Sequence, residues 1–105
     1  MVMKRIIYFG MDKCPKCDKF SPLVTQLMLT GIPIAKHEWE ITQHPNKPKY
    51  PPALLFLDGD KTVYGLFPMD LYILNKNLKL FPELYDYSSA EEFMRYVCKK
   101  HLDIS

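Results

Sequence analysis

The chain has 105 residues, of which 48% are hydrophobic and 25% charged, and its net charge is +2. This length predicts a single domain over residues 1–105, and the small net charge excludes a broad electrostatic attraction to nucleic acid or to lipid. Three cysteines are too few, and odd in number, for a secreted disulfide-stabilised scaffold. We therefore expect a monomeric, cytoplasmic protein with neither nucleic acid nor a membrane among its partners.

The first predicted element is a buried strand. Residues 6–9 are all apolar and end at Gly10, a pattern that is typical of a strand covered on both faces. The same run is too short for a signal peptide and far too short to span a membrane. We therefore interpret it as a strand of the core.

A helix and a second strand follow along the chain. Five apolar residues repeat at helical spacing over residues 20–28, and Gly31 marks the end of this predicted helix. Residues 32–41 alternate loosely between polar and apolar positions, which predicts a strand. Residues 43–52 are polar and rich in proline, so we expect a loop there.

The second half of the chain predicts a hairpin. Residues 53–57 form another fully apolar run, and residues 62–64 can return antiparallel across a turn at 58–61. Residues 75–77 suggest one more turn. The hairpin would add antiparallel strands to the sheet that the first strands begin.

A last helix completes the predicted order of elements. Ser88 and Ser89 are each followed three residues later by a glutamate, which gives overlapping capping boxes for a helix that ends near His101. The whole order predicts an α/β fold with a mixed four-stranded sheet. A parallel strand–helix–strand unit comes first, followed by an antiparallel hairpin and a C-terminal helix. We expect helices on both faces of this sheet.

A CxxC motif, Cys14-Pro15-Lys16-Cys17, lies between the first strand and the first helix. At a helix N-terminus, the unpaired backbone N–H groups and the helix dipole favour a thiolate, and Lys13 and Lys16 add positive charge. Pro15 is tolerated in the first helical turn. In this interpretation Cys14 attacks a substrate disulfide, and Cys17, one turn further on, resolves the mixed disulfide.

Three stretches of the chain resemble the thioredoxin family and its disulfide-isomerase relatives. "CPKCDKFSP" is similar to the family's active-site helix, where a proline stands five positions after the second cysteine, as Pro22 does here. "QHPNKPKYPPALLFLDGD" resembles the family's cis-proline and central apolar strand, which implies that Pro52 is the cis-proline. "ELYDYSSAEEFMRYVCKKH" is similar to the last strand and closing helix. The resemblance covers most of the chain except about residues 60–80.

The resemblance implies a thioredoxin fold and a thiol–disulfide oxidoreductase that acts on the disulfides of client proteins, as a reductase. The implied site consists of two catalytic cysteines and the residues of a substrate groove: Cys14 and Cys17, then Pro51, Pro52, Lys13 and Lys16. Backbone beside Pro52 would pair with an extended client segment. The redox-active Cys14–Cys17 disulfide would need no metal and no organic cofactor, and a reductase or glutathione would supply electrons.

The chain departs from the family's pattern beside the cysteines. Lys13 stands where the family has a tryptophan, and Tyr8 stands where thioredoxin has a buried acid that accepts a proton. The segment before Pro52 is shorter, which predicts the loss of its helix, and thioredoxin's first strand and helix have no counterpart. The core is therefore closer to glutaredoxin in size, although only Gly65 stands where glutaredoxin has paired glycines for glutathione.

Two alternatives remain open at this point. Cys98 and His101 could join the CxxC cysteines in a Cys3His zinc site, although Cys98 also suits a small buried hydrophobe. His37 and His44 are interpreted as solvated residues. In the second alternative the chain is a binding module in which residues 60–80 dock a partner, and the CxxC motif is incidental or binds zinc.

Overall fold

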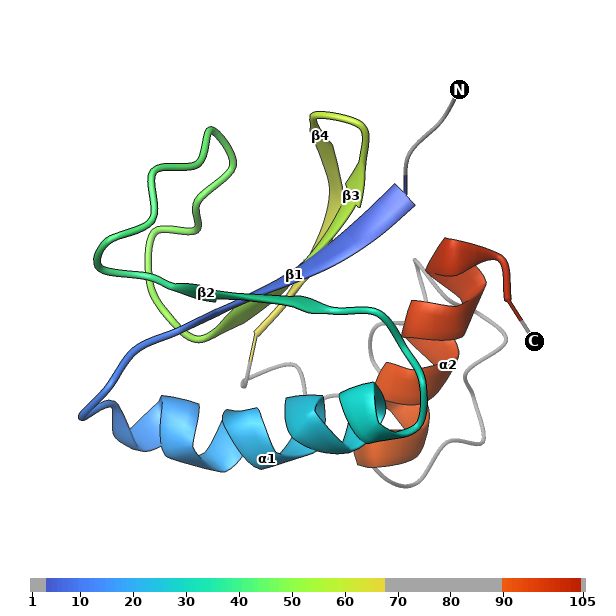
Figure 1. Cartoon of the computed structure of the whole chain (residues 1–105), viewed down its shortest axis with the longest axis horizontal. Helices are drawn as coiled ribbons and strands as arrows, with labels where there is room; N and C mark the ends of the chain where they lie inside the picture. The colour runs from blue at the N-terminus through green and yellow to red at the C-terminus, as the bar shows by residue number, and fades with distance from the viewer. Residues whose placement is uncertain (1–3, 68–89, 105) are drawn as a thin grey trace.

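The computed structural model describes residues 4–67 and 90–104 (Figure 1). Within these residues it has four strands and two helices: β1 Lys4–Gly10, α1 Pro15–Leu29, β2 Ala35–Glu38, β3 Ala53–Asp58, β4 Lys61–Leu66 and α2 Ala90–Leu102. Neither helix is long and apolar enough to cross a membrane. The expected turn at residues 75–77, the capping residues 88 and 89, and the last strand implied by the family resemblance lie outside the described residues.

The four strands form one mixed sheet in the order β2-β1-β3-β4. β1 pairs in parallel with β2, where Ile7 lies opposite Ala35, and antiparallel with β3, where Phe9 lies opposite Ala53. β3 pairs antiparallel with β4 across a turn in which Gly59 has a φ of 64°. The two central strands are the two fully apolar runs of the sequence, because a central strand is covered on both faces. The predicted topology is therefore confirmed.

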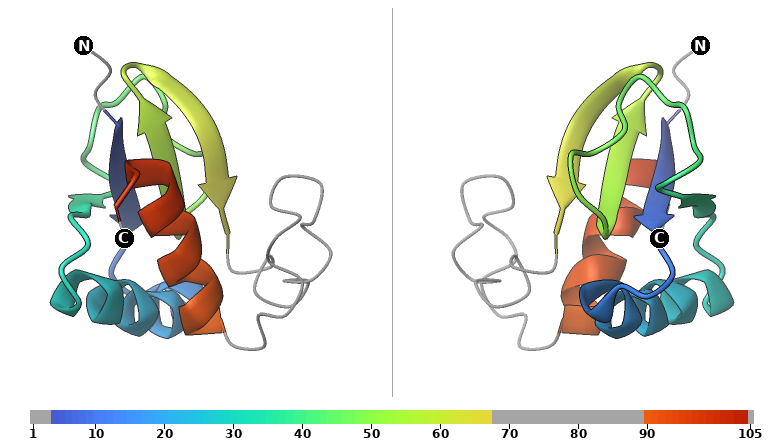
Figure 2. Two further views of the ribbon diagram at one scale, coloured as in Figure 1. Left: turned by 90° about the vertical axis from the view of Figure 1, so that its right-hand side faces the viewer. Right: turned by 90° about the vertical axis from the view of Figure 1, so that its left-hand side faces the viewer.

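Both helices pack against the same face of the sheet and contact each other (Figure 2). The core on this face combines alternate positions of the strands with the apolar sides of the helices. Its main members are Ile6, Tyr8, Leu54, Phe56, Leu66, Phe20, Val24, Leu27, Phe93, Met94, Val97 and Cys98. The expectation of helices on both faces is wrong for the part of the chain that the structure describes, since α1 and α2 share one core.

The other face of the sheet is covered by the chain between β2 and β3. Trp39 packs against five buried side chains of this face. They are Ile7, Phe9, Ala53, Leu55 and Leu57. The indole Nε1 of Trp39 donates a hydrogen bond to the Pro48 carbonyl oxygen at 2.8 Å, and the Lys47 ammonium lies 4.5 Å from the ring centre. Residues 39–52 contain no helix. The prediction that the family's helix before Pro52 is missing is therefore confirmed, and a loop covers this face instead.

Two histidines on this face differ from the prediction. The rings of His37 and His44 are half-buried, with their centres 5.6 Å and 6.1 Å from that of the Phe9 ring. His44 Nδ1 also accepts a hydrogen bond from the backbone N–H of Asn46 at 3.0 Å. The interpretation of both as solvated residues is therefore wrong, because aromatic contacts with a buried strand hold them.

α1 ends in a hydrogen-bonded turn that leads the chain toward β2. Gly31, with a φ of 96°, donates to the Met28 carbonyl oxygen at 3.1 Å, and Ile32 donates to the Leu27 carbonyl oxygen at 3.2 Å. This pair of bonds satisfies carbonyl groups that a helix end leaves free. Pro22 lies inside α1, so the helix continues through the proline and keeps the crossover to β2 intact.

The end of α2 is fastened to the sheet through His101. Its Nε2 atom lies 2.9 Å from the Leu57 carbonyl oxygen and 3.2 Å from the Arg5 carbonyl oxygen. Both partners are acceptors, so Nε2 carries the proton. The ring also meets Phe56 edge to face, with centres 5.4 Å apart, and one side chain therefore joins α2 to both central strands.

Candidate functional site

The two cysteines lie where one end of the sheet meets the N-terminus of α1 (Figure 1). β1 ends at Gly10, and a turn leads from there into Cys14, directly before α1. β3 begins at the same end of the sheet, because its first residue, Ala53, pairs with Phe9. Pro52 comes immediately before this pairing. The sheet therefore brings the CxxC segment and the start of β3 to the same end of the molecule.

The turn before α1 holds Lys13 in a left-handed conformation. Its φ is 56°, in a region that residues other than glycine, asparagine and aspartate rarely adopt. This conformation costs a lysine about 1 kcal/mol. The next residue, Cys14, has the extended backbone of a helix N-cap, with φ −118° and ψ 107°. The strained turn thus places Cys14 at the helix start.

Cys14 caps α1 with its own sulfur. Its Sγ accepts the backbone N–H of Cys17 at 3.2 Å, which satisfies one of the N–H groups that a helix start leaves unpaired. The two sulfur atoms lie at disulfide-bonding distance, and the Cα atoms are 5.1 Å apart, within the range of natural disulfides. Pro15 occupies the first turn. The pair can therefore form an internal disulfide without a movement of the helix.

Charge and exposure distinguish the two sulfurs. Cys14 is 8% exposed and Cys17 is 3% exposed, so an approaching substrate meets Cys14 first. The side chains of Lys13 and Lys16 are exposed on either side of Cys14. Together with the positive end of the helix dipole, these cations favour the thiolate form of reduced Cys14. The arrangement suits a nucleophilic thiolate at position 14 and a second, less exposed thiol at position 17.

Tyr8 fills the space beneath the start of α1. Its buried ring stacks on Phe20 of the helix, with ring centres 5.9 Å apart and an interplanar angle of 1°. Burial raises the pKa of the Tyr8 hydroxyl above its ordinary value. A hydrogen bond with Ser21 opposes this shift, and the charges of Asp18 and Glu38 add to it. The hydroxyl therefore stays protonated at neutral pH and cannot serve as a base for the cysteines.

Gly10 makes room for the tyrosine. A Cβ atom at this position would lie 2.8 Å from Cε2 and 2.9 Å from the hydroxyl of Tyr8, closer than packed atoms approach. Ser21, the hydrogen-bond partner of Tyr8, follows Cys17 by four residues and lies next to it along the helix. A neutral phenol therefore stands at the position where, by the family resemblance, thioredoxin has a buried acid.

Beside the CxxC segment, residues 50–52 leave a short stretch of backbone free. The Pro51–Pro52 peptide bond is cis, where the resemblance implied a cis-proline. Pro52 is buried, Pro51 is half-buried, and Tyr50 is 68% exposed. Within the described residues, the backbone groups of Tyr50 and Pro51 have no hydrogen-bond partner. The sequence analysis missed Tyr50, although an aromatic residue directly before two prolines in a polar loop has little chance of burial.

The residues of the alternative zinc site are not brought together. Cys98 lies in the core between α2 and the sheet, where burial raises the pKa of its thiol to about 12. His101 is engaged with backbone carbonyl groups of the two central strands. Across residues 4–67 and 90–104, no three histidine, cysteine or acidic side chains gather as metal ligands would. Cys98 is thus the small buried hydrophobe of the simpler interpretation.

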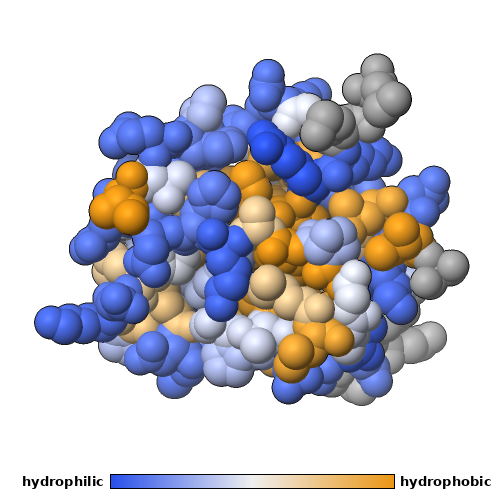
Figure 3. Space-filling view, in the orientation of Figure 1, coloured by the Kyte–Doolittle hydropathy of each residue, from blue (hydrophilic) through white to orange (hydrophobic). Residues whose placement is uncertain are grey.

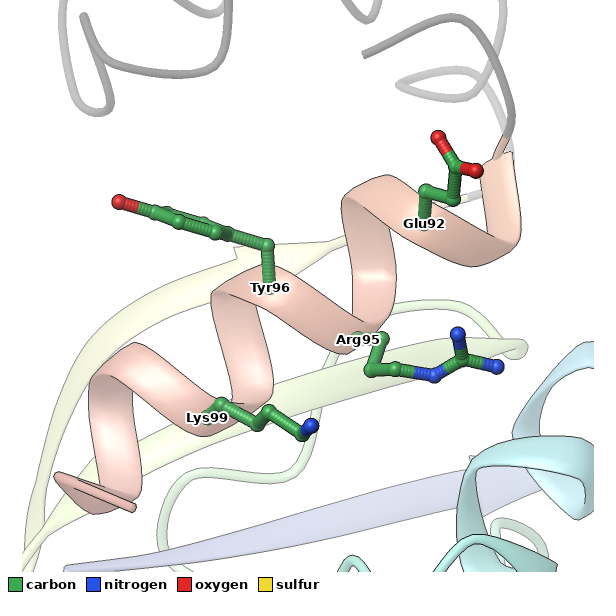
Figure 4. A pocket seen from close by; sticks show the side chains of 4 residues that line it. All are labelled: Glu92, Arg95, Tyr96 and Lys99. Atoms are coloured by element: carbon green, nitrogen blue, oxygen red, sulfur yellow. The ribbon is translucent and has the colours of Figure 1, made fainter. Parts of the chain in front are cut away.

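A cavity of about 240 Å³ lies along α2, away from the residues named for the CxxC site. Glu92, Arg95, Tyr96 and Lys99 line it, and Arg95 and Lys99 extend to the same side of the helix (Figure 4). Arg95 is paired with Glu91 at 2.6 Å. Of the segment 60–80, for which partner docking was an alternative, residues 60–67 are described and mostly form β4, while 68–80 lie outside the described residues.

The surface around the site is largely polar. In the view of Figure 3, hydrophobic side chains gather over the middle and right of the molecule, and the left part, where the N-terminus of α1 and the β2–β3 loop lie, is mostly hydrophilic. Two exposed hydrophobic side chains belong to the β2–β3 loop: Ile41 and Tyr50. Recognition beside Cys14 would therefore depend mainly on charged and backbone groups.

Comparison with known proteins gives structural matches only. No protein-family model matches the chain, and a search of curated proteins finds no match. The periplasmic thioredoxin SoxS from Paracoccus pantotrophus, in its reduced form, is 17% identical with a TM-score of 0.50, covering 62% of this chain and 79% of its own. This match is one of fold alone.

Two further solved structures have TM-scores of 0.47. Thioredoxin-2, a component of malaria parasite protein secretion machinery, is 18% identical and covers 72% of this chain and 84% of its own. Thioredoxin O2 from Arabidopsis thaliana, in its oxidised state, is 17% identical and covers 75% of each chain.

Proposed function

We propose that this chain, which has the thioredoxin fold, is a thiol–disulfide oxidoreductase that reduces disulfides of client proteins. One observation carries the proposal. Cys14 caps α1, accepts the Cys17 N–H on its sulfur at 3.2 Å, and lies at disulfide-bonding distance from the Cys17 sulfur. Such a pair can hold two electrons as a dithiol and release them by closing into a disulfide.

The first step uses the more exposed cysteine. The Cys14 thiolate attacks one sulfur of the client disulfide, forms a mixed disulfide with it, and releases the other client sulfur as a thiolate that takes a proton from solvent. The helix N-terminus and the exposed Lys13 and Lys16 favour the attacking thiolate. This step breaks one S–S bond and forms one.

The second step uses the cysteine behind it. Cys17 loses its proton and attacks the Cys14 sulfur, which releases the second client sulfur and leaves the Cys14–Cys17 disulfide. The client gains two electrons and two protons. The protein loses two electrons and the Cys17 proton, and the second proton comes from solvent, to which Cys14 gave its own proton when it ionised. Because Tyr8 stays protonated, the proton of Cys17 leaves toward water or toward the departing client thiolate rather than to a buried base.

The same charges bear on the direction of the reaction. Positive charge that stabilises the reduced thiolate raises the reduction potential, so we expect a weaker reductant than thioredoxin. We propose a monomer in the cytoplasm, with client protein disulfides as substrates and a reductase or glutathione as the electron donor. The disulfide itself is the redox group in this proposal, without a metal or an organic cofactor. Pro51 and Pro52 border the substrate groove.

Reduction of insulin by dithiothreitol tests the function. The protein should accelerate the reaction, and Cys14→Ser should abolish the acceleration, because the attacking sulfur is lost. Cys98→Ala is the matched control and should retain the wild-type rate, since Cys98 is fully buried in the core. Wild-type turnover by Cys14→Ser would overturn the assignment of the nucleophile, and the absence of any acceleration by the native chain would overturn the proposed function.

A further inference from the structure

We infer that the rim of the Cys14 site selects client disulfides whose cysteines are flanked by acidic residues. Lys13, Lys16 and Lys49 are the groups that recognise them. The inference rests on the proposed function and deepens it, since it names a class of substrate: an extended peptide disulfide with carboxylates beside the cysteine. Two separate elements supply the three cations, the start of α1 and the segment before β3.

The first observation is that the cations around Cys14 are available. Lys13 and Lys16 are exposed on either side of the buried Cys14 sulfur. In the described part of the chain, neither Lys13 nor Lys16 is in an ion pair with a carboxylate. The two lysines therefore meet an approaching substrate without an internal carboxylate on them.

The carboxylates near this end of the molecule do not cancel the lysines. Asp18 and Glu38 both act on the buried hydroxyl of Tyr8, and the Lys36 ammonium, 6.0 Å from the centre of the same ring, offsets part of their charge. Asp12 is exposed in the turn before Lys13. From Asp12 to Lys19 the exposed charged side chains are three lysines and two aspartates, so the segment that carries the Cys14 sulfur keeps a net positive charge.

The second observation lies on the other wall of the site. Tyr50 is 68% exposed, and the Lys49 ammonium lies 5.9 Å from the centre of its ring. The antiparallel register of β1 with β3 joins Phe9 to Ala53; one more step of this register would set Pro52 opposite the end of β1. Lys49 and Tyr50 precede Pro52 by three and two residues, and both side chains are exposed.

The backbone here restricts how a client can lie. Pro51 and Pro52 have no N–H groups, so this stretch offers hydrogen-bond acceptors to an incoming strand. The carbonyl of Pro51 has no partner in the described part of the chain. An extended client segment can donate to it, place an apolar side chain on the Tyr50 ring, and bring acidic side chains to the lysines.

The expected selectivity comes from charge and is therefore sensitive to salt. Rim charges at an interface act mostly on the rate of encounter, and their effect falls as ionic strength rises. Three cations of one sign should favour an acidic over a basic peptide by about tenfold in kcat/KM at low salt. The preference should shrink toward unity at high salt.

The test uses three peptide disulfides that differ only beside the cysteine, where they carry glutamate, glutamine or lysine. Each kcat/KM is divided by the rate of the same peptide with dithiothreitol alone, because an acidic neighbour slows attack by any thiolate. The expected order is glutamate, glutamine, lysine, with about tenfold between the extremes at low salt. Equal normalised rates, or a preference for the lysine peptide, would overturn the inference.

A triple variant locates the effect. Lys13→Asn, Lys16→Gln and Lys49→Gln are combined, and asparagine is chosen at position 13 because it accepts the left-handed backbone. The ratio of acidic to basic peptide should fall to about one. This ratio does not move with the thiolate content of Cys14, which changes all three rates alike. Lys61→Gln, on β4 at the opposite end of the sheet, is the matched control and should keep the wild-type ratio.

The proposed function and the inferred selectivity would be contradicted by different results. If the native protein reduces none of the three peptides, the proposed function fails. If it reduces the glutamine peptide well but shows no preference among the charged ones, the oxidoreductase survives and the inferred selectivity is wrong. If the triple variant keeps the native ratio, the lysines named here are not the source of the preference.

Discussion

Cys14, at the start of α1, and Cys98, near the end of α2, both have lysine neighbours but lie in opposite environments. Cys14 precedes α1 and has Lys16 two residues on, and Cys98 lies in the last turns of α2 and is followed by Lys99. Cys14 meets the positive end of a helix dipole and is 8% exposed, whereas Cys98 lies in the core near the negative end and is 0% exposed. Backbone position and burial, rather than neighbouring lysines, therefore decide which cysteine can act as a nucleophile.

The largest expected effect is in thiol reactivity. In the reduced, folded protein at neutral pH, iodoacetamide should label Cys14 at least about a hundredfold faster than Cys98, because Cys98 is accessible only when the core opens. Cys17, 3% exposed, should also react slowly. A time course with mass mapping of labelled peptides measures the three rates. Labelling of Cys98 at a rate comparable to that of Cys14 would contradict the claim that backbone position and burial decide which cysteine reacts.

Alkaline pH should destabilise the fold through Cys98. The thiol titrates near 9.0 when unfolded and at about 12 when folded, so the unfolded state binds fewer protons in this window. The stabilisation is complete below pH 9 and is lost as pH rises toward 12, by up to about 1.4 kcal/mol per pH unit. Tyr8, with its raised pKa, adds to the loss above its ordinary value of 10.0.

Urea unfolding of the oxidised protein at a series of pH values measures this slope, because the Cys14–Cys17 disulfide then does not titrate. Cys98→Ala should lower the stability at neutral pH and flatten the slope above pH 9. Equal slopes for the variant and the native protein would show that Cys98 is not the group that titrates.

The support beneath α1 can be tested at Gly10. Gly10→Ala should lower the free energy of unfolding by about 2 kcal/mol, because the added Cβ would lie 2.8 Å from the Tyr8 ring. A double-mutant cycle with Tyr8→Leu should show that the two costs are not additive, since the smaller side chain leaves room. Additive costs, measured by urea unfolding, would mean that Tyr8 does not contact position 10.

The smallest expected effect comes from the lysine near each cysteine, Lys16 for Cys14 and Lys99 for Cys98. Lys16→Glu should lower the alkylation rate of Cys14 by about threefold at low salt and less at high salt, because it replaces a favourable charge with an unfavourable one. It should also make the protein more reducing. Lys99→Glu should leave the Cys14 rate unchanged. An equal effect of the two substitutions would point to net charge rather than local position.

Patterns that one strand or helix determines by itself were predicted well. The two apolar runs became β1 and β3, because burial on both faces leaves no polar position in a strand. The CxxC pair at the start of α1 and the cis bond at Pro51–Pro52 lie where the sequence and the resemblance implied. The catalytic roles of Cys14 and Cys17 stay predictions. So do the roles of Pro51, Pro52, Lys13 and Lys16 in a substrate groove.

Features that depend on contacts between residues far apart in the sequence were not predicted. The second strand was expected over residues 32–41 but covers Ala35–Glu38, because Trp39 donates to the Gly10 carbonyl oxygen at the end of β1 and the chain then turns. A loop covers the second face of the sheet through Trp39, and a sequence pattern cannot show that loop side chains suffice. The contacts of His37 and His44 with Phe9 arise from the same closure.

The amide of Asn46 donates to the carbonyl oxygen of Asp60 at 2.6 Å, so the β2–β3 loop touches the hairpin turn at the opposite end of the sheet from Cys14. A designer seeking a place to fuse a reporter domain would choose that turn, since Gly59 has open space around it. An insertion there would pull on the loop that carries Tyr50 and the two prolines. A domain fused at the hairpin turn would therefore act on the β2–β3 loop through the Asn46–Asp60 hydrogen bond.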